Sequence, residues 1–206
     1  DADGKNDSKK FQTKGFKDII TVLKMPIVWL IAVVILTAYA AYWGTLRFTS
    51  YSSDIFSMSV TMAAAISVGK MWMNPPASLI AGFISDKIGI AKSIAILFIA
   101  LIASFTVFAF MPGLPALLPF MIINVAFASL AIFAIRAIYF ALLEEGGVPM
   151  AITGTAAGFV SMIGFTPDIF MPLLGGMLLD AIPGPAGYRL FFLSVVGICV
   201  IGLIAT

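Results

Sequence analysis

Residues 93–135 form a run of 43 positions without one charged side chain, and this run limits the possible folds more than any other feature. As a single helix it would be about 64 Å long at 1.5 Å per residue, twice the roughly 30 Å hydrocarbon core of a bilayer. The segment "MPGLPALLP" at 111–119 divides the run, because proline interrupts helices and glycine favours turns. The run therefore predicts two consecutive membrane spans joined by a tight turn.

The composition of the whole chain agrees with a membrane protein. Hydrophobic residues make up 61% and charged residues 11%, whereas soluble domains carry roughly 25% charged residues. The net charge of +2 gives no indication of nucleic-acid binding. The chain contains no histidine, which excludes Ser–His nucleophiles and the usual zinc sites, and its single Cys199 cannot form an internal disulfide. We expect neither a metal nor a cofactor.

Applied to the whole chain, the same reasoning predicts six transmembrane helices, because a span needs roughly 20 apolar residues. They form one transmembrane domain over 25–206, after a hydrophilic lead-in at 1–24 that resembles an interdomain linker and lacks an initiator Met. We therefore expect the chain to be a fragment with a partner upstream. The expected spans are 26–50, 58–84, 92–111, 116–143, 150–179 and 188–206.

The distribution of basic residues predicts the orientation of these spans. Lys87 and Lys92 lie in one loop, and with six spans this loop shares a membrane side with both chain ends. The opposite side carries only Arg47 and Arg189. Because cytoplasmic loops are enriched in lysine and arginine, we expect both ends to be cytoplasmic, in a bacterial inner (plasma) membrane. The lead-in side holds Lys5, Lys9, Lys10, Lys14, Lys17 and Lys24.

A weak internal repeat appears when the sequence is shifted by 94 residues. Segments 59–86 and 153–180 then share six identities, including Gly82 with Gly176 and Asp86 with Asp180. The repeat places the second span on the fifth, so the two copies would cross the membrane in opposite directions. Inverted repeats of three helices are a known device of transporters. The sequence therefore predicts an all-α integral membrane fold of six helices in a 3+3 inverted repeat.

The loop between the second and third spans contains the motif Gly-x-x-x-Asp-Lys-x-Gly, formed by Gly82, Asp86, Lys87 and Gly89. This motif resembles the cytoplasmic loop signature of the major facilitator superfamily, although residues 90 and 91 are apolar where that signature has bases. The resemblance implies the C-terminal six-helix half of a transporter, whose partner is an N-terminal six-helix half of the same protein. Within the superfamily, the chain is most similar in character to sugar-phosphate and sugar-acid permeases.

The chemistry of the motif suits a coupling or gating role. Gly82 permits close approach of a neighbouring helix, and Gly89 can adopt a positive φ in a tight turn. Asp86 can cap a helix N-terminus or pair with a base such as Lys87, and a pair of this kind can hold one conformation. The alternative is a plain polar turn with lysines that follow the positive-inside bias.

Several polar residues lie inside the expected spans, where they must face protein or water because a charge in lipid is costly. Lys70 lies midway along the second span. Ser67 and Asn74 are three and four positions away from it, so the three residues are expected to form a polar stripe on one helical face. We expect a central aqueous cavity between the first, second, fourth and fifth spans. The expected substrate-binding residues are Lys70, Asn74, Ser67, Arg136, Asn124, Tyr39 and Tyr42, and the expected coupling or gating residues are Asp168, Asp86, Lys87, Gly82 and Gly89.

These residues favour a secondary active transporter that moves a small anionic solute by alternating access, as a symporter or an antiporter. Lys70 would bind the anionic group, and Asp168 would be the protonatable or gating carboxylate. Lys70 as a structural partner of a carboxylate, and Arg136 as an interfacial anchor, remain open. A non-transporting membrane scaffold or sensor is the alternative function. A membrane-embedded enzyme fits less well, because we find neither a nucleophile with its base nor a metal cluster.

Overall fold

The computed structural model describes residues 15–206, and all of its regular elements are helical. The first 14 residues of the expected lead-in lie outside the described residues, and residues 15–23 are helical. Three short 3-10 turns, Pro115–Leu117, Tyr139–Ala141 and Met150–Ile152, adjoin the α-helices. The α-helices are α2 (Pro26–Leu46), α3 (Phe48–Phe56), α4 (Val60–Met71), α5 (Asn74–Ile88), α6 (Ile90–Phe110), α7 (Leu118–Ile138), α8 (Leu142–Glu145), α9 (Thr153–Gly164), α10 (Pro167–Ala181) and α11 (Pro185–Ala205).

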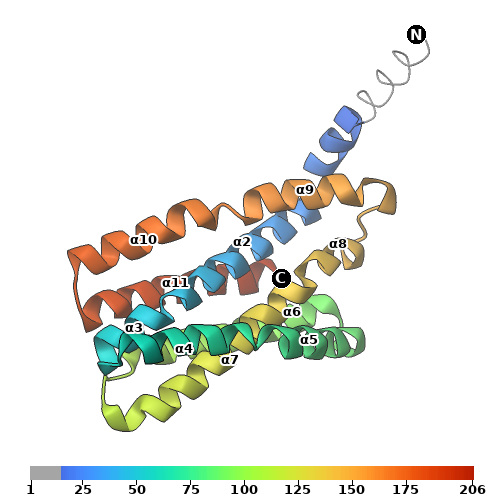
Figure 1. Cartoon of the computed structure of the whole chain (residues 1–206). Helices are drawn as coiled ribbons and strands as arrows, with labels where there is room; N and C mark the ends of the chain where they lie inside the picture. The colour runs from blue at the N-terminus through green and yellow to red at the C-terminus, as the bar shows by residue number, and fades with distance from the viewer. Residues whose placement is uncertain (1–14) are drawn as a thin grey trace, which may run out of the picture.

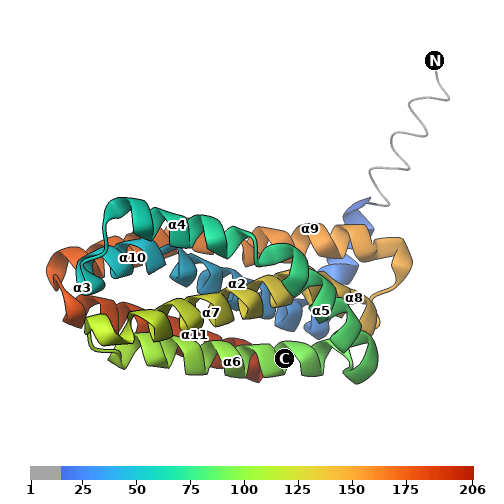
Figure 2. The ribbon, with the colours of Figure 1, turned by 60° about the horizontal axis from the view of Figure 1, so that its bottom comes forward.

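Five helical segments of the described chain are long and apolar enough to cross a membrane. The helices lie roughly side by side along one common direction, as a membrane bundle requires (Figures 1 and 2). Lipid-facing helices need no polar outer surface, which explains the many large apolar side chains on the outside of the bundle. The five segments are Pro26–Phe56, Ile90–Phe110, Pro115–Glu145, Met150–Ala181 and Pro185–Ala205.

The segment expected to form the second span, 58–84, is not one continuous helix. It consists of α4 with 12 residues and α5 with 15, separated by a turn at Trp72 and Met73. Pro75 and Pro76 cause the break, because neither can donate the backbone hydrogen bond that would continue the helix. Of the six expected spans, the second is therefore a broken pair of helices, and the other five match the five long apolar segments.

The lengths of the helices repeat along the chain. α2 and α7 each have 21 residues, and so do α6 and α11. The two broken segments also match, since α4 and α9 each have 12 residues and α5 and α10 each have 15. α9 begins 93 residues after α4, within one residue of the shift seen in the sequence. Pro167 begins α10 much as the prolines begin α5, so both breaks have the same kind of cause.

The centre of the bundle is α2, which packs against α7, α9, α10 and α11. Small residues let the neighbours approach closely, as in other membrane bundles. Gly202 of α11 is one such position, because a Cβ there would lie 2.4 Å from Thr37 Oγ1 and 2.5 Å from the Phe98 ring. α6 packs against both α7 and α11 and completes the bundle on that side. This arrangement leaves α4 and the outer faces of α9 and α10 largely exposed.

Candidate functional site

Two cations lie beside one aromatic ring, that of Tyr42 on α2. The Arg136 Cζ atom, from α7, lies 4.2 Å from the centroid of this ring, and the Lys70 Nζ atom, from α4, lies 5.7 Å from it. Tyr39 stacks on Tyr42 with 5.8 Å between centroids, and the Arg136 Cζ atom lies 5.6 Å from the Tyr39 ring. Cations within about 6 Å of a ring face are attracted by its quadrupole. Three helices thus bring together four of the expected substrate-binding residues.

Lys70 is 5% exposed, and its ammonium is bound by the end of α2. Nζ donates to the Thr45 carbonyl oxygen at 3.3 Å and to the Thr45 hydroxyl at 3.2 Å. The carbonyl is within reach because α2 ends at Leu46, and the last carbonyls of a helix lack regular partners. The hydroxyl itself donates to the Tyr42 carbonyl at 2.7 Å, so its lone pairs are free to accept from Lys70.

Asp168 lies at the edge of this group, in the first turn of α10. Its Oδ1 atom accepts a hydrogen bond of 2.9 Å from the indole Nε1 of Trp43 on α2. The Tyr39 hydroxyl also lies next to the Asp168 carboxylate, and the Tyr39 ring contacts Phe165 at 4.9 Å between centroids. A carboxylate is favourable at a helix N-terminus, and the break between α9 and α10 creates that terminus within the span.

We call Tyr39, Tyr42, Trp43, Lys70, Arg136 and Asp168 the charged aromatic site. Its two cations and one carboxylate carry a net positive charge, and its aromatic rings offer flat apolar surfaces. The Arg136 guanidinium can bind a carboxylate or phosphate through two parallel hydrogen bonds, whereas the Lys70 ammonium acts as a point charge. Within residues 15–206, no group of three or more metal-ligating side chains is present. The site is therefore suited to recognising a small anion.

The polar stripe expected along 58–84 does not form. Ser67 hydrogen-bonds Thr49 of α3, and Asn74 is exposed at the start of α5, where its carbonyl and side-chain oxygens accept from Ser78. The turn between α4 and α5 rotates the second helix relative to the first, so spacings of three and four no longer mark one face. Of this stripe, only Lys70 lies in the charged aromatic site.

Asn124 is predicted to line the cavity with Arg136, but the structure does not place it beside Arg136 in the charged aromatic site. Its side chain is 7% exposed and binds Ser104 of α6, accepting from the hydroxyl at 2.9 Å and donating to the carbonyl at 3.1 Å. The two residues are twelve positions apart on α7, which leaves about 120° between them on a helix of 3.6 residues per turn. Asn124 therefore links α7 to α6 through Ser104.

The motif at 82–89 has a structural role that differs in part from the expected one. Gly89 lies between α5 and α6 with a φ of 93°, the positive value expected for it. Asp86 and Lys87 are both exposed, and neither caps a described helix. Gly82 is half-exposed, and a Cβ added to it would meet nothing within 4 Å among the described residues, so no close helix contact explains it here.

The N-terminus of α6 is instead capped by a residue outside the motif. The Glu145 carboxylate, from the end of α8, accepts hydrogen bonds from the backbone amides of Ile90 at 2.7 Å and Ala91 at 3.2 Å. A negative charge at this position also interacts favourably with the helix dipole. Sequence reasoning missed Glu145 because a contact across 55 residues leaves no local pattern. It also missed Thr45, whose acceptor role depends on the break between α2 and α3.

Two curated proteins resemble this chain. The Escherichia coli K12 inner membrane protein YihN is 30% identical over 177 residues, which cover 84% of the chain and 42% of YihN. The inner membrane protein YqcE of the same organism is 26% identical over 198 residues, which cover 94% of the chain and 46% of YqcE. No family model matches the chain. The chain thus spans less than half the length of the curated relatives it matches.

These findings correct the family suggested by the loop motif. Both relatives are named as inner membrane proteins rather than as members of the major facilitator superfamily, and no family model supports that assignment. Among the described residues five helical segments are of spanning length, so the structure does not by itself establish the six spans of a facilitator half. What the comparisons and the structure support together is the location: the chain is an integral inner membrane protein.

Proposed function

We propose that this chain is part of a secondary active transporter that moves a small anionic solute by alternating access. The observation that carries the proposal is the pair of cations, Lys70 and Arg136, at 5.7 and 4.2 Å from the ring of Tyr42 inside an otherwise apolar bundle. A buried charge within a membrane is costly, and such residues usually serve a solute or ion pathway. In this proposal Lys70 and Arg136 bind the anionic group, and Tyr39 and Tyr42 contact the body of the solute.

Asp168 is the candidate for coupling. It accepts a hydrogen bond from Trp43 and lies at the break between α9 and α10, where a change in its charge would alter a contact between α10 and α2. Protonation of this carboxylate would remove the charge that stabilises the α10 N-terminus. We propose that Asp168 carries a coupling proton or gates access. The protein is a symporter if the proton moves in the same direction as the solute, and an antiporter if it moves in the opposite direction.

The proposed membrane arrangement has six spans, with α4 and α5 forming one broken span. The equal lengths of α4 and α9, and of α5 and α10, support two related units of three spans each. Broken helices near the bilayer midplane are typical of transporter binding sites. We further propose that a second set of helices, from the rest of a longer protein, covers the charged aromatic site. Residues 25–206 would then be one domain, with 1–24 as its cytoplasmic lead-in.

The proposal is tested by solute uptake into proteoliposomes containing the protein in its longest expressed form. Gluconate and glucose 6-phosphate serve as anionic probes, and glucose is the neutral control. We expect saturable uptake of at least one anion, no uptake of glucose, and loss of the anion uptake when Lys70 and Arg136 are both replaced by Gln. Uptake that is unchanged in the double variant would contradict the assigned site.

The second candidate function is a non-transporting scaffold or sensor, and this chain is not proposed to be an enzyme. A sensor could use the same cation pair to bind an anion without moving it. Fluorescence of Trp43 can report anion binding separately from transport, because its indole is hydrogen-bonded to Asp168 within the site. Replacing Trp29 and Trp72 with Phe leaves Trp43 as the one tryptophan of residues 1–206, and a Trp43→Phe version of the same variant identifies the part of the emission change that comes from Trp43. A saturable change in its emission with an anion, but without uptake in the same preparation, would favour a sensor.

A further inference from the structure

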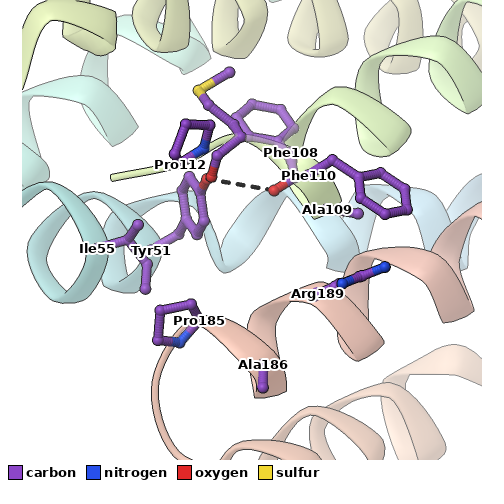
Figure 3. A pocket seen from close by; sticks show the side chains of 10 residues that line it. Tyr51, Ile55, Phe108, Ala109, Phe110, Pro112, Pro185, Ala186 and Arg189 are labelled. Carbon is purple, nitrogen blue, oxygen red and sulfur yellow. Dashed lines mark hydrogen bonds between the residues drawn. The ribbon is translucent and has the colours of Figure 1, made fainter. Parts of the chain in front are cut away.

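A second site lies outside the charged aromatic site, at the end of the bundle where α3, α6 and α11 meet. It is a cavity of about 340 Å³ between these helices (Figure 3). Tyr51 and Ile55 of α3 form one wall, and Phe108 to Pro112 form a second. Ala186 and Arg189 lie on α11 on the other side of the cavity, as the close view shows. None of these residues belongs to the charged aromatic site.

One side of this cavity is formed by buried aromatic side chains that pack on one another. Tyr51 and Phe108 are 2% and 1% exposed, and their rings meet edge to face with 5.7 Å between centroids. Tyr51 also contacts Phe192 at 5.3 Å and Tyr188 at 5.4 Å, so α3, α6 and α11 share one aromatic cluster. The Tyr51 hydroxyl donates to the Phe108 carbonyl at 3.3 Å, the hydrogen bond drawn in Figure 3. Side chains that are already packed in this way lose little conformational freedom when a ligand binds beside them.

Arg189 gives the cavity its charge. Its side chain is exposed in the first turns of α11, and its Cζ atom lies 4.5 Å from the centroid of the Phe110 ring. The ring holds the guanidinium through a cation–π contact and leaves the planar N–H groups available to oxygen atoms. The remaining lining is mainly apolar, from Ile55, Pro112, Pro185 and Ala186.

The cavity lies at the surface of the membrane. α6 begins at Ile90, next to Lys87 and Lys92, and its 21 residues extend about 31 Å, so Phe110 lies at the opposite membrane face. This depth is that of lipid phosphates and glycerol groups. α6 and α11 carry exposed apolar side chains, among them Ile99 and Ile201, which suit contact with lipid on this side of the bundle.

From the cavity, the charge and the depth together, we infer that this site binds one anionic phospholipid of the leaflet opposite to Lys87 and Lys92. The phosphate accepts hydrogen bonds from Arg189, and the glycerol and first acyl carbons fill the apolar part between Ile55, Pro112 and Ala186. A guanidinium matches a phosphate with two parallel hydrogen bonds, and the surrounding apolar walls strengthen this interaction. The lipid would link α3, α6 and α11 at one end.

The test measures thermal unfolding of the protein, in its longest expressed form, in detergent micelles. The added probe is short-chain phosphatidylglycerol, and the parallel titrations use phosphatidylcholine of equal chain length and inorganic phosphate. We expect a saturable rise in Tm with phosphatidylglycerol alone. Arg189→Gln should weaken the fitted affinity by about tenfold or more, the loss expected for a charge-assisted hydrogen bond. The matched control is Lys92→Gln, which removes an exposed cation from the first turn of α6 and should leave the affinity unchanged.

Two further variants keep the test decisive if Arg189→Gln does not fold. Ala186→Phe fills the cavity and should abolish the rise in Tm, while Arg189→Lys keeps the charge and should retain part of the affinity. Equal responses of wild type and the cavity variants would overturn the inference. An equal response to phosphatidylcholine would show that charge is not recognised, and an equal response to phosphate would show a site for free anions. The absence of any response would indicate that a protein segment fills the cavity.

Discussion

The ammonium of Lys70 is held by a single residue, Thr45, which provides both a carbonyl oxygen at 3.3 Å and a hydroxyl oxygen at 3.2 Å. Neither acceptor carries a formal charge, so these bonds satisfy the geometry of the ammonium without neutralising it. A buried cation that retains its charge can attract an anion strongly, because the surroundings are poor at screening. The hydrogen bonds to Thr45 thus lower the free-energy cost of burying the Lys70 ammonium and leave its charge available to attract a solute.

Replacing Thr45 with Val should destabilise the protein. The substitution removes the hydroxyl and leaves the Lys70 ammonium with one acceptor instead of two, and a hydrogen bond to a charged group contributes about 1.5–3 kcal/mol. Thermal unfolding in detergent should show a lower Tm for Thr45→Val and a nearly unchanged Tm for Thr45→Ser, which keeps the hydroxyl. If Thr45→Ser lost as much stability as Thr45→Val, keeping the hydroxyl would not be sufficient, and its bond to Lys70 could not explain the loss.

Replacing Lys70 with Gln should weaken anion binding more than it slows transport. Glutamine can still hydrogen-bond Thr45 but has no charge for the solute, so the half-saturating concentration should rise by about tenfold or more. The measurement is the concentration dependence of uptake in proteoliposomes, with Lys92→Gln as a control that removes an exposed lysine outside the predicted sites. Wild-type affinity in Lys70→Gln would make Lys70 a structural residue and remove the main support for an anionic solute.

Replacing Asp168 with Asn should separate exchange from accumulation. The Asn carbonyl oxygen can still accept from Trp43 Nε1, so the contact between α2 and α10 is kept while the titratable group is lost. Counterflow exchange should therefore continue, and uphill accumulation driven by a proton gradient should disappear. Trp43→Phe is the complementary variant, since it removes the donor and leaves the carboxylate. Normal accumulation by Asp168→Asn would place the coupling group elsewhere.

Replacing Glu145 with Ala should loosen the first turn of α6. The carboxylate caps the amides of Ile90 and Ala91, and loss of such a cap costs about 1 kcal/mol. Hydrogen exchange of the peptide that contains these amides should become faster in Glu145→Ala. The control is Glu144→Ala, because Glu144 is exposed and adjacent but makes no capping bond to α6. If both variants exchanged alike, the cap would be ineffective in solution.

The orientation of the chain in the membrane is tested with an impermeant thiol reagent on intact cells. Ala116 and Ile182 are exposed at one end of the bundle and Ile88 at the other, so each can be replaced singly by Cys. We expect labelling at 116 and 182 from outside and labelling at 88 only after lysis. The native Cys199 is fully buried and should react at neither stage. The reverse pattern would place both chain ends outside.

The sequence was sufficient to locate most spans but not to orient their side chains. Long apolar runs identify spanning helices because lipid tolerates few alternatives. Lys70 and Arg136 are exceptional because they are charged residues within expected spans. Which face a residue occupies depends on continuous helical geometry, and the turn at Trp72 and Met73 interrupts that geometry between Lys70 and Asn74.

Contacts between distant segments could also not be predicted from the sequence. Thr45 meets Lys70 across 25 residues, and Glu145 meets Ile90 across 55. Each contact depends on how helices pack and on where a helix ends, which are properties of the assembled bundle rather than of a local pattern. The contact of Asn124 with Ser104 is a further example, because a polar residue within a span can bind a neighbouring helix as well as line a cavity.

The position of α11 has a consequence for biosynthesis. It is the last described helix to leave the ribosome, yet it packs along both α2 and α6, with Val195 and Gly202 against earlier helices. Until α11 enters the membrane, the small-residue surfaces of α2 that it will cover, including Gly44, must face lipid or a chaperone. Chains released before that step should therefore be recognised as unassembled and degraded, which makes the insertion of α11 a checkpoint in the production of the protein.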